Sequence, residues 1–329
     1  MMRNVSFKPL LVFVAAAFST QLAQAATPER CEAQKVFAVV AHGGELSERV
    51  EDNGRLAAMR AALVDARAAL AHGASSLDVV ETIIRRFEDS GIFNAGKGAI
   101  ANAKGQVETD ASIMDGRDLG AGAVASMTGI KNPIHAARLV MEKSPHVLFV
   151  GDRGEATVKS LGAESVAPDY FISNKQPSKP GPEHGTVGAV ALDRCSHIAA
   201  GTSTGGYSGK WSGRVGDSPI IGASTYANDA VGGFSATGHG EHFIRFSISK
   251  DVADRMRYAG ETIDAAMKDD LVDTLVPFKD SDGALIGIDA HGHVAMQWNR
   301  VGLFRGFATD EEAPIVAQYE GPTASKPRH

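Results

Sequence analysis

The sequence predicts an α+β protein in which β-sheets pack against one another and helices lie outside them. The first observation behind this is that apolar, strand-like runs occur in pairs. Residues 186–192 pair with 197–202, and residues 284–289 pair with 293–298, each across a short polar connection. The second observation is that segments with helical spacing gather in blocks, before the first pair and between the two pairs. Strands and helices grouped in this way favour stacked sheets with helical outer layers.

The first part of the chain begins with a strand and two helices. Residues 35–41 are apolar and predict a buried strand that runs into a His-Gly-Gly turn. Residues 54–72 carry apolar side chains three and four positions apart, which predicts a helix. A second helix begins at Ser75, where Asp78 three residues later completes a capping box, and it continues to about residue 88.

Three further helices and one loop region follow. Asn132-Pro133 predicts a helix start, with Asn as the cap and Pro in the first turn. Residues 201–240 are rich in glycine, and we expect loops there. Helices are expected near residues 242–258 and 261–272, between the two strand pairs.

The first 25 residues have the pattern of a secretory signal peptide. Arg3 and Lys8 form a positive region, residues 9–18 form an apolar core, and an Ala-Gln-Ala cleavage signal ends the segment. The core is too short to span a bilayer. We therefore expect residues 1–25 to be removed, and the mature protein to be periplasmic or secreted without membrane attachment.

Composition and charge narrow the class of partner. The 329 residues are 43% apolar and 22% charged, which suits a soluble globular protein with a sizeable core. Removing residues 1–25 takes away two positive charges and no negative ones, so the formal net charge changes from -6 to -8. Binding nucleic acid requires a basic surface, so we expect no such partner. Export permits a disulfide between Cys31 and Cys195, but the sequence leaves pairing and free thiols equally open.

The junction of Gly185 and Thr186 is the most informative local feature. Residues 173–184 are polar and proline-rich, and a buried strand follows Thr186. At such a junction the Thr hydroxyl can attack the preceding carbonyl, and water then hydrolyses the ester. The new N-terminal Thr holds both a nucleophile and a base, because an α-amine has a reference pKa of roughly 7.7–8.0. Taken alone, Gly-Thr-Val more often marks an ordinary junction of loop and strand.

Several motifs occur in an order that resembles one family. They are FNAGKG (93–98), DASIMDG (110–116), GTVG (185–188), TSTGG (202–206), GRVGDSP (213–219) and SATGHGE (235–241). Together they closely resemble the plant-type L-asparaginases, also called isoaspartyl or β-aspartyl peptidases, from about residue 36 to 305. These are N-terminal-nucleophile (Ntn) hydrolases with a threonine nucleophile. The resemblance implies a four-layer αββα sandwich of two stacked sheets flanked by helices.

The resemblance assigns catalytic roles to five residues. Thr186 matches the nucleophile of both self-cleavage and substrate hydrolysis. Thr204 matches a second Thr whose hydroxyl orients the nucleophile. Thr237 and the N–H of Gly238 match the donors to the oxyanion, and fixed donors there lower the barrier to acyl transfer. Asn94 matches an active-site Asn; without the resemblance, Thr204 could be a strand-end hydroxyl and Asn94 a turn residue.

The resemblance also implies a substrate-binding pair. Arg214 and Asp217 match the residues that bind the free α-carboxylate and α-amine of the substrate, and the planar Arg fork suits a carboxylate. Gly238 and Gly240 let the backbone approach a ligand closely. On local sequence alone, an Arg and an Asp three positions apart would be an ordinary surface ion pair.

No organic cofactor is implied, but a structural sodium ion is. The family's loop at this position binds sodium through backbone carbonyls, which leave no side-chain signature. The matching residues here are Phe87, Glu88, Ser90, Phe93, Ala95 and Lys97. The chain departs from the family's usual residues at Tyr207, Trp211 and His239, beside the expected pocket, which leaves substrate preference open.

The implied reaction is hydrolysis of β-aspartyl amides, either L-asparagine or β-aspartyl dipeptides. Self-cleavage would divide one domain into an α chain (26–185) and a β chain (186–329) that stay associated, and two such units would form an (αβ)2 assembly. One alternative is a glycosylasparaginase-like N-glycan amidase, whose cut site typically reads HDTIG where this chain has HGTVG. The other is a noncatalytic exported protein that binds amino acids.

Overall fold

Two β-sheets lie face to face in the computed structural model, which describes residues 34–171, 185–278 and 281–326. Within these residues one sheet has eight strands. In spatial order they are β12 (Ile315–Ala317), β11 (Gly302–Thr309), β1 (Ala38–Leu46), β5 (Val187–Leu192), β6 (Ile198–Thr204), β2 (Thr109–Asp115), β3 (Ala121–Met127) and β4 (Leu148–Val150). The other sheet has the order β10 (Val294–Trp298), β9 (Gly283–Asp289), β8 (Gly232–Gly238) and β7 (Tyr226–Asn228).

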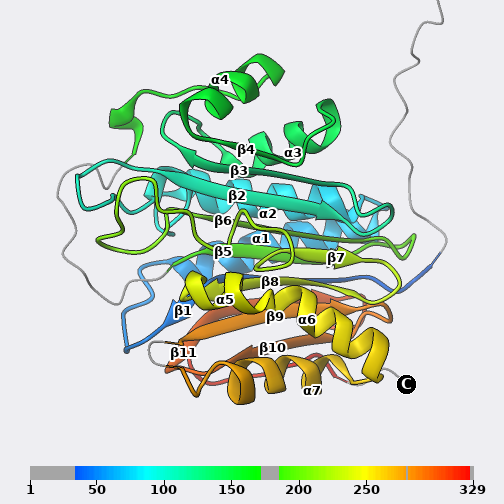
Figure 1. Cartoon of the computed structure of the whole chain (residues 1–329). Helices are drawn as coiled ribbons and strands as arrows, with labels where there is room; N and C mark the ends of the chain where they lie inside the picture. The colour runs from blue at the N-terminus through cyan, green and yellow to red at the C-terminus, as the bar shows by residue number, and fades with distance from the viewer. Residues whose placement is uncertain (1–33, 172–184, 279–280, 327–329) are drawn as a thin grey trace, which may run out of the picture.

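Helices cover the outer face of each sheet (Figure 1). The larger sheet carries α1 (Arg55–Ala71), α2 (Ser76–Ser90), α3 (Pro133–Lys143) and α4 (Gly151–Leu161). The smaller sheet carries α5 (Gly240–Phe246), α6 (Ile248–Asp254) and α7 (Ile263–Lys268). The predicted four-layer αββα sandwich is confirmed.

Two separate apolar cores explain why the layers stay together. One lies between α1, α2, α3 and the larger sheet, and includes Leu63, Ile84 and Val187. The other lies between the two sheets and under α6 and α7, and includes Val190 and Phe234. Successive residues of β5 contribute to both cores, because strand side chains alternate between faces and both faces of this central strand are covered.

Most predicted elements are present, but the two predicted helix starts are capped in different ways. Ser75 caps α2 as predicted, accepting a hydrogen bond from the Asp78 N–H (3.1 Å). Asn132 precedes α3 as predicted, but its side chain makes no capping bond and instead donates to Asp89 (2.9 Å). The first-turn N–H of Ile134 is bonded by the buried carboxylate of Glu88 (3.0 Å). Asn132 is therefore the N-cap residue as predicted, but the capping hydrogen bond comes from Glu88 of the neighbouring helix and not from its own side chain.

The region from residue 201 to 240 is not all loop, which corrects the sequence-based expectation. It ends in β7 and β8, and β8 pairs with β9 along its whole length. The many small residues of β8 weaken the apolar alternation that identifies a strand in the sequence. They nevertheless suit a strand that packs closely between two layers. The expected helix at 242–258 is also interrupted, because Ser247 adopts a left-handed conformation (φ 52°) between α5 and α6.

Several predictions fall on residues that the structure does not describe. The signal peptide (1–25), Cys31 and most of the linker before Gly185 lie outside the described residues. Cys195 is disulfide-bonded, and its pairing with Cys31 stays a prediction. Within the described ranges, no helix has the length and apolar character needed to cross a membrane.

Candidate active site

Two threonine hydroxyls meet at the edge of the larger sheet. Thr186 immediately precedes β5, and Thr204 is the last residue of β6. The antiparallel register pairs Val187 with Ser203, which sets Thr186 opposite Thr204. The Thr186 hydroxyl donates a hydrogen bond to the Thr204 Oγ1 (2.9 Å), and both residues are buried. The Thr204 oxygen also accepts from the Gly206 N–H (2.9 Å), which fixes its position.

The smaller sheet brings Thr237 toward the same point. A Cβ on Gly233 of β8 would lie 2.8 Å from the side chain of Val190, and one on Gly188 would lie 2.0 Å from the Ser235 Oγ. These two contacts define a stacking register of β8 on β5. Continuing the same register by one further step of two residues sets Thr237 over Thr186.

The hydroxyl of Thr237 is buried and has no hydrogen-bond partner within the described residues. The whole residue is only 1% exposed. An unpaired buried hydroxyl is uncommon in native proteins, and this one is free to donate a hydrogen bond to a ligand. Gly238 follows at φ 145°, with its Cα so close to β9 that a Cβ would lie 2.4 Å from the Asp282 carbonyl oxygen. Only glycine fits there.

Asn94 holds the turn that follows Thr204. Its side chain donates to the Gly206 carbonyl (2.5 Å) and accepts from the Ile100 N–H (2.8 Å). Its backbone carbonyl accepts from the Gly205 N–H (3.0 Å). Asn94 also lies close to Gly185, because a Cβ on Gly185 would lie 2.8 Å from the Asn94 Cβ. The structure therefore places the predicted Asn beside the junction of Gly185 and Thr186, where it holds the neighbouring backbone.

The predicted substrate-binding residues lie together in a second cluster. A Cβ on Gly240 would lie 2.5 Å from the Asp217 Oδ1 and 2.9 Å from the Arg214 Nη2. Burial raises the pKa of Asp217 to about 6, although the nearby Arg214 charge opposes this. The Asp217 Oδ2 has no hydrogen-bond partner within the described part of the chain. A buried carboxylate with an unused oxygen is suited to receive an ammonium group.

The partner of Arg214 within the protein is Glu241, the last residue of the SATGHGE motif, for which the sequence predicted no role. The Nε and Nη2 atoms of Arg214 donate to the two carboxylate oxygens of Glu241, both at 3.0 Å. The guanidinium also lies 4.5 Å from the centre of the Tyr207 ring. In the sequence, the only hint of a role for Glu241 was its position directly after Gly240. The contact between Glu241 and Arg214 could not be predicted, because it depends on how the loop from 205 to 225 folds.

Two of the three unusual residues noted in the sequence take part in this cluster. The ring of His239 stacks on Tyr207 with centroids 5.9 Å apart, and its Nε2 lies 3.3 Å from the Glu241 carboxylate. Trp211, by contrast, is 83% exposed and points away from the protein interior. Tyr207 and His239 are therefore the departures that can influence the substrate.

His42 was missed as a neighbour of the nucleophile. It pairs with Gly188 across β1 and β5, it is fully buried, and its Nε2 is 3.1 Å from the Ser235 Oγ. Burial lowers its pKa to about 3, so the ring is neutral. The only signal in the sequence was the His-Gly-Gly turn after the first strand. A neutral imidazole here supports the strands beneath Thr186 without adding charge.

The predicted sodium-binding residues lie at the end of α2 and in the turn that follows. Phe87, Glu88 and Ser90 belong to α2, and Lys97 lies in a short 3-10 turn (Gly96–Gly98). The carbonyl oxygens of Gly91 and Phe93 converge on Gly98, where a Cβ would lie 2.8 and 2.2 Å from them. Gly91 is not among the predicted residues, and the Phe93 carbonyl also accepts a hydrogen bond from the Ala95 N–H (2.9 Å), so the sodium site stays a prediction. Within the described residues, no cluster of three or more His, Cys, Asp or Glu side chains could hold a metal ion.

The chain is similar to known isoaspartyl peptidases and L-asparaginases. The family model described as asparaginase matches residues 34–180 and 173–317. An isoaspartyl peptidase of Salmonella typhimurium is 40% identical over 267 residues, which cover 75% of this chain and 85% of that protein. A probable isoaspartyl peptidase/L-asparaginase of Arabidopsis thaliana is 37% identical over 292 residues, covering 77% and 88%. The human isoaspartyl peptidase/L-asparaginase is 40% identical over 230 residues, covering 64% and 74%.

Proposed function

The chain belongs to the asparaginase family of Ntn hydrolases, and we propose that it cuts itself before Thr186 and then hydrolyses L-asparagine and β-aspartyl dipeptides. The observation that carries this proposal is the hydrogen bond of 2.9 Å between the Thr186 and Thr204 hydroxyls, directly after Gly185. It holds a nucleophile in one orientation at the bond to be cut.

Self-cleavage is an N→O acyl shift followed by hydrolysis. The Thr186 Oγ1 attacks the carbonyl carbon of Gly185, the C–N bond breaks, and the nitrogen becomes the α-amine of Thr186. Water then cleaves the ester, leaving a carboxylate on Gly185 and restoring the hydroxyl. The β-branch of Thr restricts χ1, and the bond to Thr204 selects the attacking rotamer.

Substrate hydrolysis uses the same hydroxyl. The free amine of Thr186 takes the hydroxyl proton as Oγ1 attacks the side-chain amide carbonyl of the substrate. The Thr237 hydroxyl and the Gly238 N–H donate to the oxygen that becomes negative. Ammonia or an amino acid leaves with the proton, and water releases aspartate from the acyl-enzyme.

The second cluster supplies recognition of the aspartyl group. Arg214 binds the α-carboxylate through donors that Glu241 leaves unused, and Asp217 binds the α-ammonium through its unpartnered oxygen. Asparagine and β-aspartyl dipeptides carry both free groups. One binding site therefore serves both substrates.

The two products of cleavage must remain associated. Strand β1, from the first part of the chain, lies between β5 and β11 of the second part, and both apolar cores contain residues from before and after the cut. Separation would expose these cores to water. We extend the proposal to an (αβ)2 assembly, a sodium ion bound by backbone oxygens near Phe93, and export to the periplasm or beyond.

The experiment is a denaturing gel of purified protein, with N-terminal sequencing of each band. We expect two fragments, the smaller beginning Thr-Val-Gly-Ala, and a preparation that releases ammonia from L-asparagine and leucine from β-aspartyl-leucine. A fully active protein that remains a single chain would contradict the mechanism. Two fragments without hydrolysis of either compound would contradict the substrate assignment only.

A further inference from the structure

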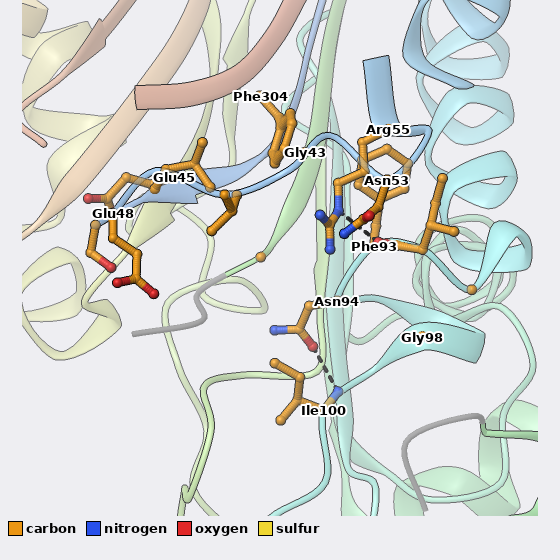
Figure 2. Close-up of a pocket in the computed structure, with 16 residues that line it drawn as sticks. Gly43, Glu45, Glu48, Asn53, Arg55, Phe93, Asn94, Gly98, Ile100 and Phe304 are labelled. Carbon is orange, nitrogen blue, oxygen red and sulfur yellow. Dashed lines mark hydrogen bonds between the residues drawn. The ribbon is translucent and has the colours of Figure 1, made fainter. Parts of the chain in front are cut away.

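A cavity lies next to Gly185, and the proposed mechanism gives it no role. Its volume is about 240 Å³, and Gly185 and Asn94 form part of its wall. The remaining wall comes from the end of β1 and the segment after it, the start of α1, the turn after α2, and Phe304 of β11, as Figure 2 shows. None of the residues that bind the aspartyl group, Arg214, Asp217 and Gly240, lines it. We call it the Arg55 cavity.

The cavity borders Gly185, one residue before the proposed nucleophile, although Thr186 itself does not line it. A dipeptide substrate has two halves joined at the amide that Thr186 attacks, and Arg214 and Asp217 hold the aspartyl half. The other half must extend from the nucleophile into space that those residues do not fill. The Arg55 cavity adjoins Gly185 and shares Asn94 with the nucleophile's surroundings, so it is a space that this half can enter.

Arg55 gives the cavity a receptor for a carboxylate. Its Nε donates to the Ile92 carbonyl (2.8 Å), and its guanidinium lies 5.3 Å from the centre of the Phe304 ring. These contacts hold the side chain, yet within the described residues its two terminal nitrogens make no hydrogen bond or ion pair. In Figure 2 the guanidinium of Arg55 lies above Asn94, whose amide oxygen is turned away toward the Ile100 N–H. A fixed guanidinium with unused donors matches the two oxygens of a carboxylate.

The facing side of the cavity is acidic. Glu45 and Glu48 lie across from Asn53 and Arg55 in Figure 2. Glu45 is 2% exposed, and neither of its carboxylate oxygens has a hydrogen-bond partner in the described ranges. Burial raises the pKa of Glu45 well above its usual value, so this carboxyl group favours its neutral form. Glu48 is exposed at the mouth and supplies the negative charge of this side. A leaving amino acid with its carboxylate on Arg55 would turn a basic side chain toward Glu48.

We propose that the Arg55 cavity is the subsite for the amino acid released from a β-aspartyl dipeptide, with Arg55 binding its free α-carboxylate and Glu48 at the mouth favouring lysine or arginine there. This inference rests on the proposed function. L-asparagine provides an internal control, because its leaving group is ammonia and does not reach the cavity.

The first test needs no variant. The KM of the wild-type protein is measured for β-aspartyl-leucine and for β-aspartyl-leucinamide, in which the carboxylate is blocked. We expect the amide to have a KM roughly tenfold higher, because it cannot pair with a guanidinium. Equal KM values for the two compounds would overturn the assignment of Arg55.

The second test uses Arg55→Gln and Arg55→Lys, with Arg60→Gln as a matched control on the same helix outside the cavity. For Arg55→Gln we expect the KM for β-aspartyl-leucine to rise roughly tenfold relative to that for asparagine, and the penalty for the blocked carboxylate to disappear. Arg55→Lys should retain part of the effect, and Arg60→Gln should match the wild type. Equal losses on asparagine and the dipeptide would show a structural role for Arg55 and overturn the proposal.

The side-chain preference is tested with β-aspartyl-lysine. We expect its kcat/KM to exceed that of β-aspartyl-leucine in the wild type, and Glu48→Gln to reduce the difference. The reverse preference would overturn the role of the acidic side. A wild-type protein that hydrolyses asparagine but shows none of these differences would contradict this subsite alone, whereas one inactive on every compound would contradict the proposed function.

Discussion

The nucleophile centre (Thr186, Thr204 and Thr237) and the substrate clamp (Arg214, Asp217 and Glu241) are built in different ways. Strand register positions the three hydroxyls. Thr186 lies just before β5 and Thr204 ends the paired strand β6, and the stacking of β8 on β5 sets the position of Thr237. The clamp is positioned by ion pairs between a loop and the start of α5. The side chains of the first centre are uncharged hydroxyls, and the second consists of charged side chains.

This difference separates two kinds of defect. Under the proposed mechanism, a change at the nucleophile centre acts on both self-cleavage and turnover, because the same hydroxyl would serve both. A change in the clamp acts on substrate binding and leaves self-cleavage intact, because Gly185 offers no free carboxylate or amine for the clamp to bind. Variants of the two regions can therefore show whether self-cleavage and substrate binding change independently.

The largest expected effect comes from Thr186→Ala. Without the hydroxyl, neither the acyl shift nor substrate attack can begin, so the chain should stay intact and activity should fall on the order of 10⁴-fold or more. Thr186→Ser is the matched control, since it keeps the hydroxyl and should still be cut. Gel analysis and ammonia release measure both outcomes, and an intact but active Ala variant would contradict the centre's assignment.

Arg214→Gln should separate the two regions. We expect normal cleavage but a KM for asparagine about 10- to 100-fold higher, because a hydrogen-bonded charge partner of the carboxylate is lost. Arg245→Gln, an exposed position on α5, serves as the control and should leave KM unchanged. Failure of Arg214→Gln to undergo cleavage would show that the clamp is needed for the nucleophile as well.

The clamp should also be sensitive to acid. The pKa of Asp217 is raised to about 6, and the carboxylate is charged only above its pKa. As the pH falls from 7 to 5, Asp217 becomes protonated and loses its attraction for the substrate ammonium, so KM should rise about tenfold. Asp217→Asn should have a high KM that does not change over this range. Measuring KM separately from kcat distinguishes this titration from that of the Thr186 amine.

The smallest expected effect is that of Glu241→Gln. Arg214 keeps its charge but loses the carboxylate that orients its fork, so we expect the KM for asparagine to rise about threefold with unchanged cleavage. Glu51→Gln, on an exposed loop, is the control. A loss as large as that of Arg214→Gln would mean that Glu241 itself contacts the substrate.

The sequence predicted the nucleophile centre better than the clamp, for a physical reason. Thr186 and Thr204 flank strands with clear apolar patterns, and antiparallel pairing then brings their positions together. Strand β8 was mistaken for a loop, because its glycines and small side chains weaken the strand pattern while permitting close packing. The motif around Thr237 was still recognisable, although the strand that carries it was not.

Sequence alone determined the αββα fold class, the expected nucleophile and most residues that surround it, because local patterns and ordered motifs encode them. Tertiary structure decided which charges meet. Arg214 pairs with Glu241 rather than lying free, His42 lies neutral beneath the strands, and Arg55 reaches a cavity beside Gly185. These contacts join residues distant in the chain, and packing of loops and layers, rather than any periodic pattern, sets their distances.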